Sequence, residues 1–401
     1  MKIQPVRGTH DIYGNELVVY KFIKDTISKL AQVYDYKEII TPIFENSELF
    51  KKPLGENSDV VLKEMYSFKD RNDSFLTLRP EYTTPMIRAA ITNNLLSKLP
   101  VKLFGFGPMF RRERPQKGRF RQFNQINFEI FGVDDQFSDV EIIALAENFL
   151  NKIVPKKSYK LHLNSLGNKD TLLKFKNELT KYFDKYKNNL SEDSVDKIQS
   201  NPLRILDSKN EKNQDLINSA PKIDQFYSKE ILKKFEEVQE LLSNANIEYE
   251  IDKNLVRGLD YYCNNVFEFK SESLGSQSTI IGGGRYDGLI KMLGGPDIPG
   301  CGWASGVERL MILSNKVQQK MSFLHVIILN ERYKNYGFNL INILRKKNIN
   351  VSFDYKYDLK KSLSKANASK AKYAIIIGED EINEKVYSLK FLEDGKQKKL
   401  N

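Results

Sequence analysis

The chain has 401 residues, with 63 Lys or Arg against 52 Asp or Glu and a net charge of +11. This length predicts two or three domains, and the composition is that of an ordinary globular protein. No window approaches 18 consecutive apolar residues, which argues against a membrane-spanning helix. The first residues have no apolar stretch after their charges, so we expect no secretory signal.

The first 154 residues are predicted to alternate between helices and short strands. In chain order we expect a helix over 15–34, strands over 36–40, 59–69 and 74–79, a helix over 85–96, strands over 101–111 and 121–133, and a helix over 139–154. Ser138 is the expected N-cap of the last helix.

The character of the chain changes after about residue 168. Residues 169–245 are mostly helical in pattern, and strand-like, Gly-rich segments return over 247–303. After another shift near 316–322, we expect a strand over 323–329, a helix over 336–347, a strand over 351–355, a helix over 360–371 and a strand over 373–377. This βαβαβ alternation predicts a small parallel-sheet α/β domain.

The distribution of charge and the small number of cysteines and histidines limit the functions that the chain can have. Residues 321–401 hold 16 Lys or Arg and 9 Asp or Glu, a net +7, which suits a polyanion such as RNA. Only two cysteines occur, Cys263 and Cys301, and the three histidines stand far apart. This excludes a disulfide scaffold and a cysteine- or histidine-built metal centre, and it fits a reducing cytoplasm.

The segment FRRERPQKGRFRQFNQINFE, residues 110–129, is the richest in arginine. Five of the 15 arginines of the chain lie within residues 111–121. Because alternate strand residues share a face, Arg111, Gln125 and Glu129 can converge on one pocket, with 112–120 as a lip. Arginine there favours a phosphate or carboxylate. The alternative is a solvated hairpin whose charges pair across the strands.

Two further segments each carry an arginine in an unusual setting. In LVRGLDYYCNNVFEF, residues 255–269, Arg257 lies among apolar residues and should either bind an anion or form a buried pair, with Asp260 as the nearest partner in sequence. In GGPDIPGCGWASGVERLMIL, residues 294–313, Arg309 lies on the first turn of a helix and either points a cation at the strand edge or is a surface arginine.

The segment IIGGGRYDGLI, residues 280–290, places three glycines after an apolar strand. It indicates a close approach of the backbone to a ligand or, equally well, a tight turn. It is neither a phosphate-cradling P-loop nor a dinucleotide fingerprint, because the spacing differs from both.

Together these segments resemble the histidyl-tRNA synthetases, a family of class II aminoacyl-tRNA synthetases, along nearly the whole chain. The similarity is carried by PVRGTHDI, TPIFENSELFKKPLGENSDVVLKEMYSF, TLRPEYTTPMIRA, FRRERPQKGRFRQFNQ, LVRGLDYY, GGGRYDGL and GWASGVERL. LVRGLDYY is the most specific of these, and the Gly-rich string and GWASGVERL are the least specific.

The resemblance implies the fold and the domains. We expect an α+β catalytic domain of the class II synthetase type, an antiparallel sheet flanked by helices, formed by residues 1–168 and 247–320. Residues 169–246 would be a helical insertion domain, and residues 321–401 a C-terminal α/β anticodon-binding domain. The first class II motif, with Pro42 as its proline, would lie at a homodimer interface.

The resemblance also implies a reaction and its site residues. Histidine and ATP would give histidyl-adenylate and pyrophosphate, and the histidyl group would then pass to the tRNA, releasing AMP. The implied catalytic residues are Arg111 and Arg257. The implied histidine-binding residues are Glu81, Thr83, Arg111, Gln125, Glu129, Arg257, Tyr261, Tyr262 and Tyr286. The implied ATP-binding residues are Arg111, Glu113, Arg119, Phe123 and Arg309.

Mg²⁺ is expected as a cofactor through ATP, with no ligand cluster of its own visible in the sequence, and the expected location is the cytoplasm. Some residues depart from the family's common pattern, notably Tyr82, Asn124, Asn127 and Cys263. Three alternatives stay open at this point: a regulatory paralogue of histidine biosynthesis, a synthetase of the same subclass for another amino acid, and a non-catalytic RNA-binding protein on the same fold.

Overall fold

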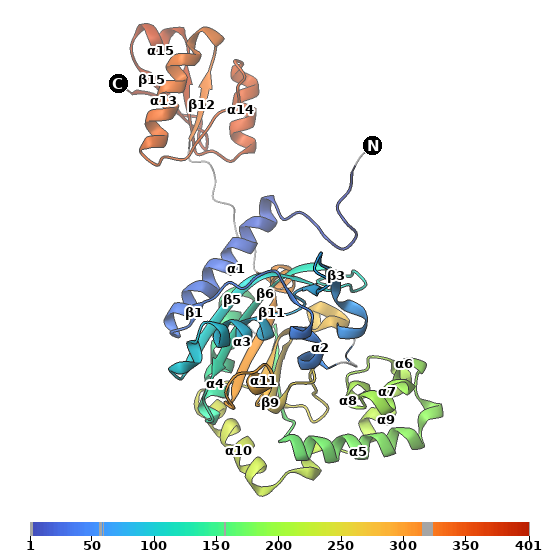
Figure 1. Cartoon of the computed structure of the whole chain (residues 1–401). Coiled ribbons are helices and arrows are strands. Elements are labelled where there is room, and N and C mark those ends of the chain that lie inside the picture. The colour runs from blue at the N-terminus through green and yellow to red at the C-terminus, as the bar shows by residue number, and fades with distance from the viewer. Residues whose placement is uncertain (1–2, 56–57, 59, 156–157, 315–323, 401) are drawn as a thin grey trace. The chain divides into compact units, whose positions relative to one another are not determined.

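The computed structural model describes the chain except for residues 1–2, 56–57, 59, 156–157, 315–323 and 401 (Figure 1). It separates into two compact units, Met1–Val317 and Gln318–Asn401, which are described one at a time. The predicted change of character near 316–322 lies outside the described residues.

An eight-stranded sheet forms the centre of the first unit, in the order β1-β5-β6-β11-β10-β9-β7-β8. Its neighbours pair antiparallel except for the two edge pairs, β1 with β5 and β7 with β8, which are parallel. The fold prediction of a helix-flanked antiparallel sheet is therefore confirmed. The strands are β1 Lys37–Glu38, β5 Val101–Phe110, β6 Gln122–Phe131, β7 Lys160–Ser165, β8 Glu250–Ile251, β9 Cys263–Lys270, β10 Thr279–Arg285 and β11 Gly300–Gly306.

Strand β6 shows how the sheet divides core from site. Its alternate residues Ile126, Phe128 and Ile130 belong to the apolar core, and Phe128 stacks on Trp303 with ring centroids 4.8 Å apart. The residues between them are polar and point to the opposite face: Gln125, Asn127 and Glu129. Because side chains alternate along a strand, the apolar requirement of one face places the polar set on the other.

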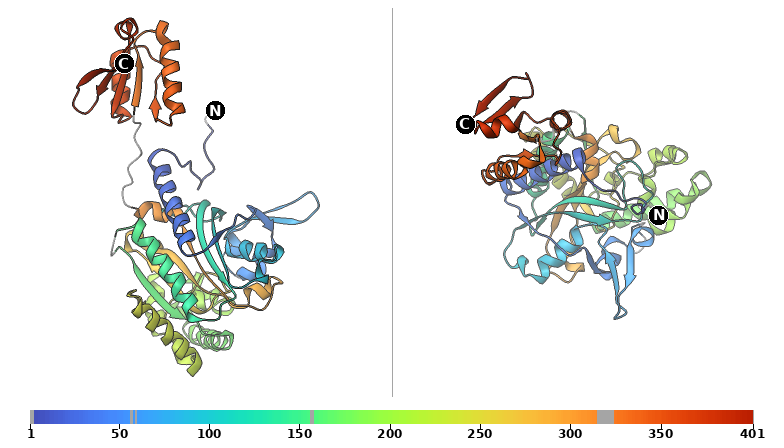
Figure 2. Two further views of the ribbon diagram at one scale, coloured as in Figure 1. Left: turned by 90° about the vertical axis from the view of Figure 1, so that its left-hand side faces the viewer. Right: turned by 90° about the horizontal axis from the view of Figure 1, so that it is seen from above.

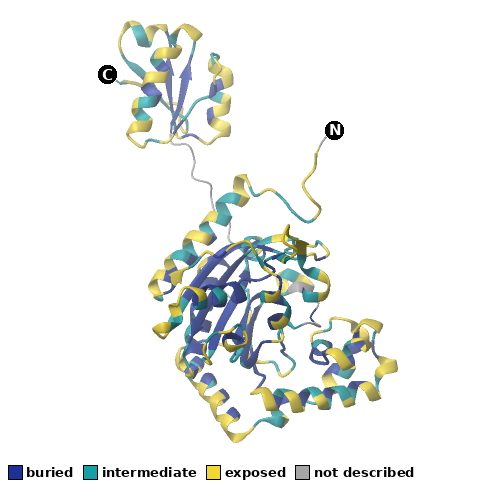
Figure 3. Cartoon of the chain, in the orientation of Figure 1, coloured by how far each residue is buried: buried dark blue, intermediate teal, exposed yellow. Residues whose placement is uncertain are grey.

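Four helices cover the apolar face: α1 Gly14–Val33, α4 Gln136–Ile153, α10 Lys229–Asn244 and α12 Val307–Leu313. Figure 2 shows α1, α4 and α10 side by side, and Figure 3 shows the buried strands beneath them. The N-cap of α4 is Asp135, whose carboxylate accepts the Phe137 N–H at 2.7 Å. The prediction of Ser138 as the cap was wrong, because the helix starts earlier and Ser138 already lies in its first turn.

The opposite side of the sheet carries smaller elements. These are β2 Phe44–Asn46, α2 Glu48–Leu54, η1 Val60–Glu64, β3 Tyr66–Lys69, β4 Phe75–Leu78, α3 Thr83–Thr92 and η2 Leu95–Ser97, with β2, β4 and β3 forming a separate three-stranded sheet. The predicted strand over 59–69 is only half right, because Val60–Glu64 forms a π-helical turn. The alternation of apolar and polar residues over five positions could not distinguish this turn from a strand.

Residues 169–226 are helical, as expected. They form α5 Lys169–Lys185, η3 Lys187–Asn189, α6 Glu192–Val195, α7 Lys197–Ser200, α8 Leu203–Leu206, α9 Glu211–Ser219 and η4 Ile223–Phe226 (Figure 1). The helix α10 that follows packs against α4 instead. Between β9 and β11 lie two short helices, η5 Glu272–Gln277 and α11 Leu289–Met292.

The second unit has a five-stranded sheet in the order β13-β12-β14-β15-β16. Its elements are β12 Leu324–Ile328, η6 Glu331–Tyr333, α13 Lys334–Lys346, β13 Val351–Ser352, α14 Leu359–Ala368, β14 Tyr373–Ile377, α15 Glu379–Asn383, β15 Tyr387–Phe391 and β16 Gln397–Leu400. The predicted βαβαβ unit is present and its three strands are parallel. The sheet is mixed, however, because β15 and β16 add antiparallel strands that the sequence analysis did not anticipate.

No helix in the described part of the chain is both long enough and apolar enough to span a bilayer.

Candidate functional site

A cavity of about 210 Å³ opens on the polar face of the eight-stranded sheet. Its walls come from β6, β10 and β11, the start of α3, the loop between β5 and β6, the loop before β9, and the first turn of α12. It is lined by every predicted site residue except Glu129 and Tyr286, namely Glu81, Thr83, Arg111, Glu113, Arg119, Phe123, Gln125, Arg257, Tyr261, Tyr262 and Arg309. The residues chosen from four separate sequence segments therefore meet in one place.

Three arginines gather at one side of this cavity. The Arg111 Nε donates to the Pro80 carbonyl at 2.8 Å, and its guanidinium lies 5.5 Å from the centre of the Phe123 ring. Arg119 pairs with Glu113, while Arg309 Nη1 donates to the Thr279 carbonyl at 2.7 Å. Burial and the nearby charge of Arg119 lower the pKa of Arg309 to about 10. A cluster of like charges in a concave site favours a ligand with several negative charges.

Arg257 is held from the sheet. It forms an ion pair with Glu268 on β9, and the other oxygen of Glu268 accepts the Thr279 hydroxyl at 2.9 Å. A Cβ at Gly282 would lie 2.3 Å from Arg257 Nη2, so only glycine leaves room for the guanidinium there. The suggested pairing of Arg257 with Asp260 was wrong: Asp260 instead accepts the Asn201 amide at 2.9 Å. Arg257 is thus a fixed cation at the cavity wall.

Glu129 is the centre of a closed hydrogen-bonded set. One carboxylate oxygen accepts the Thr83 hydroxyl at 2.7 Å and the Asn127 amide at 3.3 Å, and the other accepts the Tyr286 hydroxyl. Burial raises the pKa of Glu129 to about 8, even though these three donors favour the anion. Glu129 and Tyr286 therefore lie directly behind the cavity wall, joined to it through Thr83.

Glu81 shapes the same wall. Its carboxylate accepts the backbone N–H groups of Thr83 and Thr84 at 2.7 and 2.8 Å, as well as the Thr84 hydroxyl. Burial raises the pKa of Glu81 above its ordinary value. Bonds from a carboxylate to the first N–H groups of α3 satisfy donors that the helix itself leaves unpaired. They also fix the start of this helix, and with it the Thr83 hydroxyl on Glu129.

Sequence reasoning missed Glu268 and Thr279 near Arg257, whereas Gly282 is one of the three glycines for which it considered a close approach. A signal was present for one of them. Glu268 is a lone acid between Phe267 and Phe269 on a buried strand, and a buried charge needs a partner. The rule that a buried charge needs a partner had already singled out Arg257. Applied to Glu268 as well, it predicts that the two residues pair.

Comparison with known proteins agrees with this geometry. A family model described as histidyl-tRNA synthetase matches residues 8–310. The chain belongs to the histidyl-tRNA synthetase family. A second model, an anticodon binding domain, matches residues 324–401.

Individual members of the histidyl-tRNA synthetase family align along the whole chain. The histidine–tRNA ligase of Wolbachia pipientis wMel is 43% identical over 398 residues, covering 99% of this chain and 97% of that protein. The ligase of the Wolbachia strain wPip is 42% identical over 400 residues, covering 100% and 98%. The apo histidyl-tRNA synthetase of S. aureus superimposes with a TM-score of 0.82 at 30% identity, covering 100% of this chain and 97% of that one.

Two residues that depart from the family's common pattern have structural partners here. The ring of Tyr82 is buried, lies 4.3 Å from the Arg79 guanidinium and occupies the space beside Gly105, where a Cβ would lie 1.7 Å from the ring. Asn124 donates to Glu308 from its backbone at 2.9 Å and from its amide at 3.0 Å. Tyr82 is therefore a core residue, and Asn124 ties β6 to α12.

Proposed function

We propose that this chain is a histidine–tRNA ligase, which activates L-histidine with ATP and transfers the histidyl group to its tRNA. The observation that carries the proposal is one cavity, in a histidyl-tRNA synthetase family fold, that is lined by clustered arginines and backed by the polar set around Glu129. In the first step a histidine carboxylate oxygen attacks the α-phosphorus of ATP, and the bond to the bridging oxygen of pyrophosphate breaks. In the second, a terminal ribose hydroxyl of the tRNA attacks the activated carbonyl and AMP leaves.

The arginine side of the cavity takes the ATP. Arg111 and Arg257 are the proposed catalytic residues, contacting the α-phosphate and the histidine carboxylate as negative charge shifts between them. Arg119 and Arg309 hold the outer phosphates. Fixed cations of this kind stabilise the charge that develops in an in-line displacement, and they need no reorganisation during the reaction. Their anchoring to backbone carbonyls and carboxylates supports this role.

The remaining groups on this side recognise the base. Phe123 stacks on the adenine, and Glu113 lies near its exocyclic amino group. The contact of Arg111 with the Phe123 ring supports this, because it orders the ring beside the phosphate-binding cation.

The opposite side of the cavity takes the amino acid. Glu81, Thr83 and Gln125 contact the amino group. Glu129 and Tyr262 recognise the imidazole, with Tyr261 and Tyr286 beside them. A neutral imidazole offers one donor and one acceptor. A carboxyl oxygen of Glu129 that accepts and a phenol that donates together satisfy both, so an analogue that lacks either nitrogen leaves a buried polar group without a partner.

Mg²⁺ is proposed to enter with ATP. Among the described residues no group of three His, Cys, Asp or Glu side chains is placed to hold a metal ion. Two carboxylates that line the phosphate side, Glu113 and Glu308, are engaged by Arg119 and Asn124. The described side chains thus do not fit a metal centre of their own, and phosphate oxygens and water are the ligands that Mg²⁺ prefers in such sites. No step is assigned to the ion.

We assign tRNA recognition outside the cavity to residues 321–401, the anticodon-binding α/β domain. The match over 324–401 and the net charge of +7 support this, since phosphate contacts dominate RNA affinity. The helical insertion 169–246 and the catalytic parts 1–168 and 247–320 complete the proposed domain division. The cytoplasm is the proposed location, because Cys263 and Cys301 are buried free thiols that suit a reducing compartment.

We also propose a homodimer. The three-stranded sheet β2-β4-β3 leaves Phe44, Phe68 and Phe75 each about half exposed, at 54%, 45% and 55%. Figure 2 shows the β3–β4 hairpin projecting from the rest of the first unit. A second copy would cover this apolar surface.

The decisive experiment is ATP–pyrophosphate exchange with each of the twenty amino acids in turn. Exchange with histidine alone, followed by histidylation of tRNA, is the expected result. Exchange with another amino acid would mean that the Glu129 side of the cavity has been misread. A folded protein that exchanges with none would favour the regulatory or RNA-binding alternative, which the arginine-lined cavity and the C-terminal match argue against.

A further inference from the structure

The strands β9 and β10 meet irregularly beside the histidine side of the cavity. Their register shifts between Gly284 and Arg285, where Arg285 comes to pair with Cys263, the first residue of β9. A shift of this kind interrupts the backbone ladder and re-aims the side chains next to it. Tyr286, the residue after β10, reaches Glu129 from this point. The irregular crossing therefore decides where the Tyr286 hydroxyl lies.

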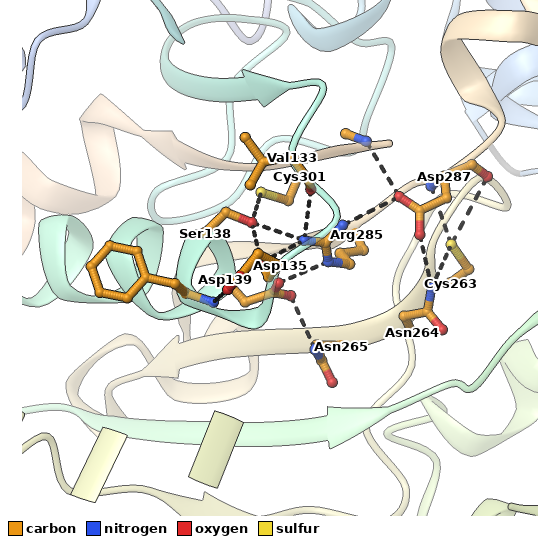
Figure 4. A network of polar contacts seen from close by, with 12 residues as sticks. Val133, Asp135, Ser138, Asp139, Cys263, Asn264, Asn265, Arg285, Asp287 and Cys301 are labelled. Carbon is orange, nitrogen blue, oxygen red and sulfur yellow. Dashed lines mark hydrogen bonds and ion pairs between the residues drawn. The ribbon is translucent and has the colours of Figure 1, made fainter. Parts of the chain in front are cut away.

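Arg285 anchors the crossing to the helix on the apolar side of the sheet. Its side chain is 2% exposed and its Nε donates to Asp139 at 2.7 Å (Figure 4). Nη2 donates to the Ser138 hydroxyl at 2.8 Å and to the carbonyls of Val133 and Asp135 at 3.0 Å each. The end of β10 is thus tied to the start of α4 through the Nε and Nη2 groups of one guanidinium.

Asp287 ties the crossing together on the other side of Tyr286. Its Oδ2 accepts the Asn264 amide at 2.8 Å, and its Oδ1 accepts the Gly300 N–H at 3.3 Å and lies 3.5 Å from Arg285 Nη1. Its own N–H donates to the Cys263 sulfur at 3.2 Å. One residue therefore joins the end of β10 to the starts of β9 and β11 (Figure 4).

These bonds join the two segments that carry the tyrosines. Cys263 and Asn264 directly follow Tyr261 and Tyr262, while Tyr286 lies between Arg285 and Asp287. The ring of Tyr286 lies 5.7 Å from that of Tyr261 and 6.4 Å from that of Tyr262. A change in the Asp287 bonds would shift one tyrosine segment against the other.

We propose that Asp287, backed by the Arg285–Asp139 ion pair, is a positioning residue of the histidine pocket. It sets the distance between the two tyrosine segments and so holds the Tyr286 hydroxyl on Glu129. The cavity is not lined by Asp139, Arg285 or Asp287, so the proposed role involves no contact with substrate. The inference rests on the proposed function for its assignment of the histidine side.

Asp287→Ala is the informative variant. The Asp287 side chain is 31% exposed, whereas Arg285 and Asp139 are buried, and removing one partner of a buried pair strongly destabilises a fold. Asp297→Ala is the matched control, because Asp297 is a nearby acid whose only described ion pair, with Lys291, is on the surface. We expect the KM for histidine to rise about tenfold in Asp287→Ala, with the KM for ATP and kcat within about twofold of wild type. Equal rises for both substrates would overturn the proposal.

A double variant tests the route through Tyr286. If Asp287 acts by placing the Tyr286 hydroxyl, then Asp287→Ala should add little to the histidine KM of Tyr286→Phe. Residues coupled in one network give non-additive effects, and independent residues give additive ones. Additive rises in KM would show that Asp287 acts elsewhere.

Amide hydrogen exchange supplies a readout that needs no activity. In Asp287→Ala, compared with Asp297→Ala, exchange should be faster in both segments 261–266 and 282–288 and unchanged elsewhere in the catalytic sheet. Unchanged exchange in these segments would overturn the positioning role. Should the wild type activate no histidine, the proposed function fails, while this measurement still decides whether Asp287 holds the crossing together.

Discussion

The two sides of the cavity are built differently. On the side proposed to bind ATP, Arg111, Arg119 and Arg257 come from loops, and each is anchored by a carbonyl or a carboxylate. On the side proposed to bind histidine, Glu129 and Thr83 come from the central sheet and a helix start, are buried, and bond to one another. One side is a set of cations on irregular backbone, and the other is a hydrogen-bonded core.

The difference fits what each side is proposed to recognise. Coulomb attraction between a cation and a triphosphate falls slowly with distance and tolerates a small displacement. A hydrogen bond to a neutral ring is directional and weakens steeply once the angle at the donor hydrogen falls below about 120°. We therefore expect changes on the first side to act mainly on turnover, and changes on the second to act mainly on histidine affinity.

The largest effect is expected for Arg257→Ala. Removing a cation that is proposed to contact the α-phosphate should lower kcat for adenylation by about 10²- to 10³-fold and leave the histidine KM nearly unchanged. ATP–pyrophosphate exchange measures both constants. Arg332→Ala is the control, because Arg332 is an exposed arginine of the second unit, paired with Glu379, and should leave adenylation unaffected. Intact turnover with a large rise in the KM for histidine would show that Arg257 acts in histidine binding and not in turnover.

Glu129→Ala should show the opposite behaviour. It removes the group that accepts from Thr83, Asn127 and Tyr286, so the imidazole loses both a partner and the order of its surroundings. We expect the KM for histidine to rise by about 10²-fold, with the KM for ATP changed by no more than about threefold. Circular dichroism and the melting temperature verify folding. Equal rises in the KM for histidine and for ATP would contradict the role of Glu129 in recognising the imidazole.

The two sides also differ in how far the sequence predicted them. The arginines stood out because charge in an apolar or crowded segment is visible in one dimension, and Arg111, Arg257 and Arg309 do meet in the cavity. The face of β6 with Gln125 and Glu129 followed from strand alternation. These inferences needed only local pattern.

What the sequence did not reveal depends on contacts between distant segments. Thr83 and Tyr286 bond to the same carboxylate from positions 46 and 157 residues away, and no local pattern encodes that. The π-helical turn at Val60–Glu64 and the antiparallel strands β15 and β16 were missed because short elements are decided by packing and not by propensity.

Gly282→Ala tests how strongly turnover depends on the position of Arg257, which lies between the two sides of the cavity. The added Cβ would meet the Arg257 guanidinium, so the cation must move while its charge remains. We expect kcat to fall about tenfold, less than in Arg257→Ala, and Glu268→Gln to act in the same direction by loosening the ion pair. Glu272→Gln, an exposed acid nearby, serves as the control. Wild-type turnover in both Gly282→Ala and Glu268→Gln would show that the position of Arg257 does not matter.

The last prediction concerns the burial of Glu129 and is measured as stability instead of turnover. With a pKa near 8 in the folded protein and about 4.3 when unfolded, Glu129 carries a proton between these values only when folded. The folded state thus binds one proton more there, and the contribution of Glu129 to the unfolding free energy falls as pH rises, by about 1.4 kcal/mol per pH unit, levelling above pH 8. Glu129→Gln does not titrate. The melting temperature of the variant relative to wild type should therefore increase from pH 5.5 to pH 8. A constant difference between the two melting temperatures over this range would mean that Glu129 is ionised throughout. In that case its three hydrogen-bond donors, and not its burial, would decide its charge.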